Sequence, residues 1–457
     1  MRRILLAAGV VAALIGARGR AVRPAPPPLV VGPTFNSEVV RIFQSQCQSC
    51  HHPGDIAPFS LMTYADAFPE AANIKLLTKT HQMPPWKPVD GCGDFADARV
   101  LSQDQIDTIG KWVDNGAPEG NVTDAPAALK FDGGWALGQP DLVLSNAQPY
   151  TPPTSGDMYR CFTMPTNLTS DQYVAAIDVK PGDRNTVHHV IAFIDTTGES
   201  ANLESQDAEP GYQCFGGPGF TITSLDSSTL GGWAPGARPV MLPDGVAYSL
   251  PANSRVVLQV HYHPHSGTPQ PDRTQIGIYY AKTKPTKLLR VLPLINQTFT
   301  IPPNDPNYRV TADFTIPFVN THVWLIAPHM HLLGRKMQVT TIQPNGQQQC
   351  LININDWDFN WQGMYRYNDP IAVPAGTRLS LEAFYDNSTS NLRNPNFPPK
   401  PVSWGELTTD EMCIAFLGFT IDSENLASGH VADASWVPKI PASVIDRSRS
   451  SRHTPRH

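Results

Sequence analysis

The sequence is poor in charge, and it lacks both a broad basic patch and a long internal apolar run. Charged residues make up 16% of the 457 positions, and the formal net charge is −6. Basic residues gather only in the short tail from Arg447 to His457, so nucleic acid is not an expected partner. No segment after the N-terminus offers the roughly 20 apolar residues that a membrane span needs.

The first 21 residues have the layout of a signal peptide. Arg2 and Arg3 precede an apolar run from Ile4 to Ile15, and small residues follow. The run is short for a membrane span, so an uncleaved anchor is the minor alternative. We therefore expect residues 1–21 to be a signal peptide, the protein to be periplasmic or secreted, and no stable membrane span after signal removal.

Cysteine is scarce, and its spacing is informative. A blue-copper multicopper oxidase needs a His-Cys-His cluster, but only Cys50 adjoins a histidine here, which disfavours that class. Export would allow disulfides to persist. Cys161, Cys214, Cys350 and Cys413 could form two disulfide bridges. Cys92 would then have no partner, and the other two cysteines belong to the motif described below.

The composition predicts a mainly β protein of two or three domains. Proline (45) and glycine (33) are plentiful, and such a length exceeds what one core usually organises. Short β-type runs are separated by turn residues at the spacing of sandwiches. The clearest runs are 174–179, 187–194, 255–262 and 275–280, then, after a connection over 288–300, 308–316, 322–327, 337–342, 378–385 and 411–419.

These runs divide the chain into an all-α segment and two successive antiparallel, jelly-roll-like β-sandwiches. We expect a small cytochrome c-like domain over 35–120, the sandwiches over 130–290 and 291–436, and a disordered tail over 437–457. Ser102 and Gln105 form a capping box for the last helix of the first segment, and Asn115-Gly116 ends that helix.

The motif Cys47-Gln-Ser-Cys50-His51 predicts a covalently bound haem c. Its two thiols can add to the haem vinyl groups, and His51 can bind the iron from one face. A zinc site or a redox dithiol would also use the two cysteines, but the following histidine favours haem. For the sixth iron ligand we choose Met83, which two prolines hold on an extended loop, over His81 and His52. The segment resembles a class I cytochrome c.

Two further groups of residues predict two copper sites, because imidazole suits copper in both oxidation states and thioether favours Cu(I). The first group is His188, His189 and His261, and the second is His329, His331 and Met412. Residues two apart on a strand point the same way, so His329 and His331 can share a metal while Met330 faces away. Adjacent His188 and His189 need a bulge, a strand end or different ring nitrogens to do so.

Other histidines are poorer candidates. A lone histidine on a strand is usually a surface or core residue, and for His261 alone that alternative stays open. His263 shares the face of His261 and could compete for the metal, but we leave it and His265 out of the ligand set. His322 lies an odd number of positions before His329 and should face the other way.

The motifs that carry these residues resemble, in their order, those of the copper type II ascorbate-dependent monooxygenases over about 300 residues. They are Met158-Tyr-Arg-Cys161, Val187-His188-His189-Val190, Leu258-Gln259-Val260-His261-Tyr262, His329-x-His331-Leu332-Leu333-Gly334 and Asp410-Glu411-Met412-Cys413. The resemblance implies an electron-transfer copper on the three histidines and an oxygen-binding, catalytic copper on His329, His331 and Met412. It also suggests a Cys161–Cys214 bridge, and we infer Cys350–Cys413 as the second.

The sequence departs from the peptide-hydroxylating members of that family. They anchor a substrate carboxylate with an arginine before the paired histidines and with asparagine and tyrosine after the methionine. Those positions here hold Ala327, Ile414 and Phe416. A carboxylate would lack a matching set of donors, so we expect a small, weakly polar substrate.

The expected function is copper-dependent hydroxylation of a C–H bond with O2 and two electrons from an external donor, either an ascorbate-like reductant or a redox protein. The haem would relay these electrons to the coppers. The main alternative is a haem c and copper electron-transfer or copper-binding protein without oxygenase activity. The sequence does not name the substrate or the donor.

Overall fold

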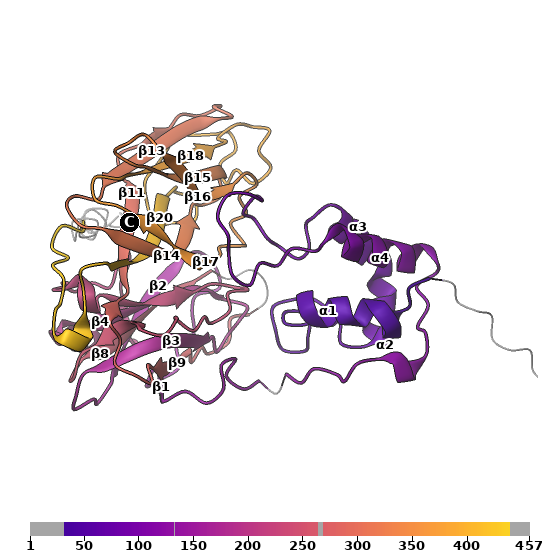
Figure 1. Cartoon of the computed structure of the whole chain (residues 1–457), viewed down its shortest axis with the longest axis horizontal. Helices are drawn as coiled ribbons and strands as arrows, with labels where there is room; N and C mark the ends of the chain where they lie inside the picture. Colours follow the sequence, from indigo (N-terminus) through magenta and orange to yellow (C-terminus); the bar gives the residue numbers. More distant parts are fainter. Residues whose placement is uncertain (1–31, 132, 264–267, 439–457) are drawn as a thin grey trace, which may run out of the picture.

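A computed structural model describes residues 32–438, with the exception of residue 132 and residues 264–267. The expected signal peptide, His265 and nearly all of the expected tail lie outside the described residues. Within the described ranges, no helix combines the length and apolar character needed to cross a membrane. The described residues form a helical unit beside two pairs of β-sheets (Figure 1).

The helical unit is built around three aromatic side chains from its first and last helices. Phe35, Phe43 and Trp112 are almost fully buried, and the rings of Phe43 and Trp112 meet edge to face at 6.3 Å. The capping box of Ser102 and Gln105 is confirmed. The helices are η1 (Phe35–Val39), α1 (Val40–Gln46), α2 (Tyr64–Ala67), η2 (Phe68–Glu70), α3 (Ala71–Lys79), α4 (Gln103–Asp114) and η3 (Val122–Asp124).

The first pair of sheets follows the alternating apolar pattern of the sequence. One sheet has the order β5-β2-β8-β4-β6, the other β1-β9-β3-β7-β10, and apolar side chains of both meet in one core. Its elements are β1 (Leu142–Ser145), β2 (Met158–Pro165), β3 (Gln172–Lys180), β4 (Val187–Asp195), α5 (Glu199–Ser205), β5 (Tyr212–Gln213), η4 (Leu225–Ser227), β6 (Thr229–Trp233), β7 (Val246–Leu250), β8 (Arg255–Tyr262), β9 (Gln275–Tyr280) and β10 (Lys287–Leu288).

The second pair of sheets has the orders β11-β20-β14-β17 and β13-β18-β15-β16, again with a shared core. Its elements are β11 (Arg290–Asn296), β12 (Thr300–Ile301), β13 (Tyr308–Thr315), β14 (Thr321–His329), β15 (Gly334–Ile342), β16 (Gln348–Ile354), β17 (Tyr365–Val373), β18 (Arg378–Tyr385), β19 (Val402–Ser403), β20 (Cys413–Ile421) and η5 (Leu426–Ser428). The expected connection over 288–300 is wrong in one respect, because it contains β11, which pairs along its whole length with β20.

The two sandwiches pack directly on each other. Leu325 of β14 belongs to the core of the first sandwich, so the β14 sheet is covered on both faces. Arg290, with its side chain fully buried, pairs with Asp226 of the first sandwich at 2.6 Å and with Glu424 of the second at 2.7 Å. Such a buried charge network holds the sandwiches in one orientation, since breaking it would strand an unpaired charge. The mainly β class with antiparallel sheets is confirmed.

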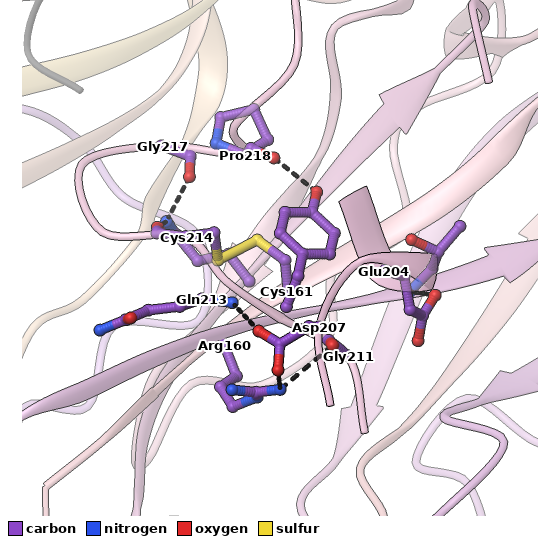
Figure 2. The surroundings of a disulfide bond; sticks show 12 residues. Arg160, Cys161, Glu204, Asp207, Gly211, Gln213, Cys214, Gly217 and Pro218 are labelled. Carbon is purple, nitrogen blue, oxygen red and sulfur yellow. Dashed lines mark hydrogen bonds and ion pairs between the residues drawn. A yellow bond between two sulfur atoms is a disulfide. The ribbon is translucent and has the colours of Figure 1, made fainter. Parts of the chain in front are cut away.

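One predicted disulfide is confirmed and the other is wrong. Cys161 of β2 is bonded to Cys214, next to the ion pair of Arg160 with Asp207 (Figure 2). Cys350, however, is bonded to Cys92, while Cys413 is a free, buried thiol. Cys350 lies on the edge strand β16, which the segment after α3 can reach. Cys413 begins the central strand β20 and faces the core, where Cys350 cannot reach it.

Candidate metal centres

The first histidine cluster lies where β4 and β8 pair. His189 stands opposite His261, and the register between these strands shifts between Val187 and His189. This irregularity lets neighbouring His188 and His189 turn their rings to the same place. The Nδ1 atom of His189 lies 3.4 Å from the Nδ1 atoms of both His188 and His261. The three residues that the sequence analysis grouped are therefore together.

The spacing of these nitrogen atoms fits one metal ion. Imidazole nitrogens bind a metal such as zinc at about 2.0–2.1 Å, so two of them around a tetrahedral ion lie about 3.4 Å apart. The ligand atoms of His188, His189 and His261 all lie within 4.8 Å of one another. Burial and the charge of the neighbouring imidazoles hold the pKa of His189 well below its ordinary value, so His189 stays neutral and able to bind a metal.

A carboxylate stands behind this cluster. Asp157 Oδ1 lies 3.0 Å from His261 Nε2 and 2.7 Å from His263 Nδ1, and Thr408 of the second sandwich donates to both carboxylate oxygens. Burial raises the pKa of Asp157, but these hydrogen bonds outweigh burial and lower it overall. Because a carboxylate only accepts, Nε2 of His261 carries the proton and Nδ1 keeps its lone pair for a metal. The ring of Tyr159 stacks on His261 at 4.2 Å.

The second cluster begins at the end of β14. The rings of His329 and His331 lie 5.1 Å apart and Met330 between them is fully buried in the core, although β14 ends at His329, so His331 is not on the strand as predicted. His329 Nδ1 lies 2.5 Å from the amide oxygen of Gln362, and His331 Nδ1 lies 3.2 Å from the carbonyl oxygen of Asp410. Both Nδ1 atoms face acceptors, which leaves each Nε2 free for a metal.

Met412 is held beside this pair by its backbone. It directly precedes β20, in which Ile414 stands opposite His329. The buried carboxylate of Glu411 accepts from the backbone N–H of His331 at 2.9 Å and from that of Met412 at 3.2 Å. The Tyr385 hydroxyl donates to the Met412 carbonyl at 2.8 Å. These contacts tie the segment with Met412 to the segment with His331.

The environment of the second cluster keeps its imidazoles neutral. Burial lowers the pKa of His329 to about 4 and that of His331 to about 3. The two clusters are also close to each other, since the rings of His189 and His329 lie 6.3 Å apart. Phe359 stacks on His188 at 4.6 Å and meets His331 edge on at 5.9 Å. Both clusters therefore share the interface between the sandwiches.

Four residues at the clusters were not predicted from the sequence: Asp157, Gln362, Phe359 and Glu411. Glu411 lies in a quoted motif but was given no role. Asp157 directly precedes the quoted segment that starts at Met158, so its position was the only available signal. Gln362 and Phe359 lie in a loop without periodicity. Of the weaker candidates, His263 bonds Asp157 and forms with Asp157 and His261 a second group whose ligand atoms lie within 4.8 Å of one another, whereas His322 pairs with Asp422 at 2.6 Å.

The Cys47-x-x-Cys50-His51 segment follows α1. Both cysteines are free thiols, and burial, followed by the nearby Cys50, raises the pKa of Cys47 to about 12. His51 Nδ1 lies 3.0 Å from the carbonyl oxygen of Phe59, so it acts as donor and leaves Nε2 available for iron. This arrangement fits the attachment of a haem.

The candidates for the sixth iron ligand lie in different surroundings. Met83 lies on the loop after α3 and is 39% exposed, and His81 on the same loop is exposed as well. His52 is paired with Asp55 at 3.1 Å and stacks on Phe131. These contacts engage His52 elsewhere, so Met83 and His81 are the better candidates.

The fold and the two clusters define a β-sandwich metalloprotein with two imidazole-rich sites between its sandwiches. Residues 289–428, which carry His329, His331 and Met412, match the family described as copper type II ascorbate-dependent monooxygenase, C-terminal domain.

Two curated relatives are similar over a longer stretch. "DBH-like monooxygenase protein 1" of Homo sapiens is 23% identical over 306 residues, which are 60% of this chain and 48% of the relative. "Peptidyl-glycine alpha-amidating monooxygenase A" of Xenopus laevis is 22% identical over 312 residues, 66% of this chain and 30% of the relative. The chain thus spans half or less of each relative. The matched domain and these relatives show that this part of the chain is similar to copper type II monooxygenases.

Proposed function

We propose that the protein is an exported copper monooxygenase that uses O2 and two external electrons to hydroxylate a C–H bond of a small, weakly polar substrate. The proposal rests on one observation: two histidine clusters, in the first of which the ligand atoms lie within 4.8 Å of one another, meet within one buried interface. His188, His189 and His261 would hold one copper ion, and His329, His331 and Met412 the other. When bound, the two ions supply the one-electron and O2 chemistry that amino acid side chains lack.

The protein groups around the ions position them and exclude water. Asp157 and Gln362 fix the protons of His261 and His329, so neither imidazole has to change tautomer to bind a metal. Phe359 fills the space between His188 and His331 and keeps that space apolar. Glu411 holds the Met412 segment against His331 through backbone hydrogen bonds.

The strands beside the second cluster favour a weakly polar substrate. Ala327 stands opposite Phe416 and His329 opposite Ile414 in the β14–β20 pair. Because alternate residues of a strand share a face, Ala327 and His329 lie on one side of β14, and Ile414 and Phe416 on one side of β20. None of the three apolar side chains can bind a charged group. The flank of the cluster is therefore suited to hydrocarbon or aromatic surface.

The electron supply that we propose uses the helical unit. Cys47, Cys50 and His51 would hold a haem c, with Met83 as the sixth ligand, and an external donor such as ascorbate or a redox protein would reduce it. The disulfide between Cys92 and Cys350 fastens this unit to the second sandwich. Two disulfides also fit a periplasmic or secreted protein.

The direct test is incorporation of oxygen from isotope-labelled O2. The copper-loaded protein is screened against small apolar and aromatic compounds with a reductant, and the products are analysed by mass spectrometry. We expect one labelled oxygen atom per product molecule. Met412→Ile should keep the copper on the three histidines and lose hydroxylation. Labelled product from Met412→Ile at the wild-type rate, or copper binding by the wild type without any labelled product, would contradict the proposal.

A further inference from the structure

The segment between α3 and α4 fastens the helical unit to the second sandwich. Its Cys92 is disulfide-bonded to Cys350, the Val89 N–H donates to the Asn353 carbonyl at 2.9 Å, and Lys87 pairs with Asp356 at 2.9 Å. In Figure 1 this indigo segment runs beside β16 and β17 before the chain returns to α4. This attachment holds the part of the helical unit that contains Cys50 against the two sandwiches.

Arg99 lies where these units meet and contacts three different parts of the protein. Its guanidinium lies near the Cys50 side chain; burial lowers the pKa of Arg99, and the charge of Cys50 would raise it. The guanidinium also donates to the Gly236 carbonyl of the first sandwich at 3.2 Å, and it lies over the Trp361 ring of the second sandwich, 4.8 Å from the ring centre. Arginine stays charged in proteins, so this cation–π contact persists at all physiological pH values.

Trp361 is also tightly packed against Gly236 of the first sandwich. Gly236 has a φ of +78°, and a Cβ atom built there would lie 2.2 Å from the Trp361 ring. Only glycine lets the indole approach the first sandwich this closely. The ring therefore contacts both Gly236 and Arg99.

The next residue leads directly to the second histidine cluster. Gln362 follows Trp361 in the chain, and its amide oxygen lies 2.5 Å from His329 Nδ1. The His329 ring in turn lies 6.3 Å from the ring of His189 in the first cluster. A continuous series of contacts thus connects Cys50, Arg99, Trp361, Gln362 and His329.

We propose that Arg99 and Trp361 form the electron-transfer contact between the haem attached at Cys50 and the copper held by His329. This inference rests on the proposed function. One electron leaves the ferrous haem, which becomes ferric, and reduces one Cu(II) to Cu(I); no proton moves. An external one-electron reductant then restores the ferrous haem. On this route the electron reaches the second cluster first. The short distance between the His329 and His189 rings would then allow it to pass to the first cluster.

The test measures haem oxidation without turnover. Protein loaded with haem and Cu(II) is kept free of O2, a light pulse generates a one-electron reductant that reduces the haem, and haem reoxidation is followed by absorbance. Trp361→Leu should slow reoxidation at least about threefold, because it removes the aromatic ring on which Arg99 stacks and interrupts the series of contacts. Trp361→Phe, which keeps an aromatic ring, should stay near the wild-type rate.

A matched control is the Trp135–Lys180 pair, in which the ammonium lies 4.3 Å from the ring centre and neither residue belongs to the series of contacts. Trp135→Leu should leave the rate unchanged, and Arg99→Leu should slow it as Trp361→Leu does. Haem and copper contents measured for each variant identify any folding defect. Equal rates in the wild type and in both Trp361→Leu and Arg99→Leu would refute the route while leaving the relay intact. A wild-type haem that never reoxidises would refute the relay and the route together.

Discussion

The two histidine clusters differ in what stands behind their imidazoles. In the first, the carboxylate of Asp157 accepts from His261. In the second, neutral oxygens of Gln362 and of the Asp410 backbone face His329 and His331. A carboxylate behind an imidazole makes it a stronger electron donor to a metal, which favours Cu(II), whereas neutral partners and a thioether favour Cu(I). The protein thus offers two chemically distinct sites.

The clusters also expose different nitrogen atoms. His261 carries its proton on Nε2 and offers Nδ1, because Asp157 lies on the Nε2 side. His329 and His331 carry their protons on Nδ1 and offer Nε2. The tautomer therefore follows from the position of the acceptor and not from the histidine itself. Replacing the hydrogen-bond acceptor behind an imidazole should therefore change the metal affinity of that cluster.

The largest expected effect comes from removing one ligand of each cluster. His188→Ala and His331→Ala should each bind about one copper ion in place of two, because a site that loses an imidazole cannot complete its ligand set. Copper content by atomic absorption and the Cu(II) spectrum by electron paramagnetic resonance check this. The two variants should leave different spectra, since different sites remain. Identical residual spectra would show that the clusters hold a single shared ion.

A smaller effect is expected from Asp157→Asn. The neutral amide is a weaker acceptor for His261, and outer hydrogen-bond partners of this kind are worth about 10- to 100-fold in metal affinity. Competition with a chelator should therefore show this loss at the three-histidine site. Thr408→Val is the control, because it removes only one donor to Asp157 and keeps the His261 contact. Equal copper affinities of the wild type and Asp157→Asn would show that the Asp157 carboxylate does not strengthen metal binding by His261.

Gln362→Glu should make the second cluster resemble the first. A carboxylate behind His329 should stabilise Cu(II) and lower the reduction potential of that site, at a cost in affinity for Cu(I) of about tenfold. Titration with a Cu(I)-selective chelator measures the affinity, and Gln362→Leu separates the charge from the loss of the hydrogen bond. If Gln362→Glu and Gln362→Leu shift the potential equally, the charge is not the cause.

The sequence predicted those parts of the fold that local pattern determines. The strands 255–262, 275–280 and 378–385 have the predicted bounds, because alternating apolar residues are bounded there by turn residues. Strand geometry predicted that His329 and His331 lie together, but β14 ends at His329, and contacts with Glu411 and Asp410 hold His331. The need for an irregularity at His188 was also foreseen, although only the register of β4 against β8 shows where it lies.

The remaining features depend on contacts between distant segments. The Cys92–Cys350 bridge spans 258 residues, and its partner was predicted wrongly because the cysteine count says nothing about which edge strand meets the helical unit. Asp157, Phe359 and Gln362 lie outside periodic segments, and packing of the sandwiches brings them to the clusters. The same packing sets the 6.3 Å between His189 and His329, which no spacing in the sequence encodes.

The smallest effect concerns the pH dependence of stability in the metal-free protein. His331 has a folded pKa of about 3, against 6.5 in the unfolded chain, so unfolding takes up a proton below pH 6.5. Its contribution to stability is present above pH 6.5 and is lost as the pH falls toward 3, at about 1.4 kcal/mol per pH unit. Burial lowers the pKa of His261 as well, but the Asp157 carboxylate opposes that shift.

His331→Gln should therefore flatten the decline of unfolding free energy between pH 6.5 and 4 more than His261→Gln does. Urea denaturation of the chelator-treated variants across this range gives the slopes. Glu411 acts in the opposite direction in the same window, because burial raises its pKa to about 8, so only differences from the wild type isolate the histidines. A steeper loss for His331→Gln than for the wild type would mean that His331 is protonated in the folded protein, and the neutral second cluster would have to be abandoned.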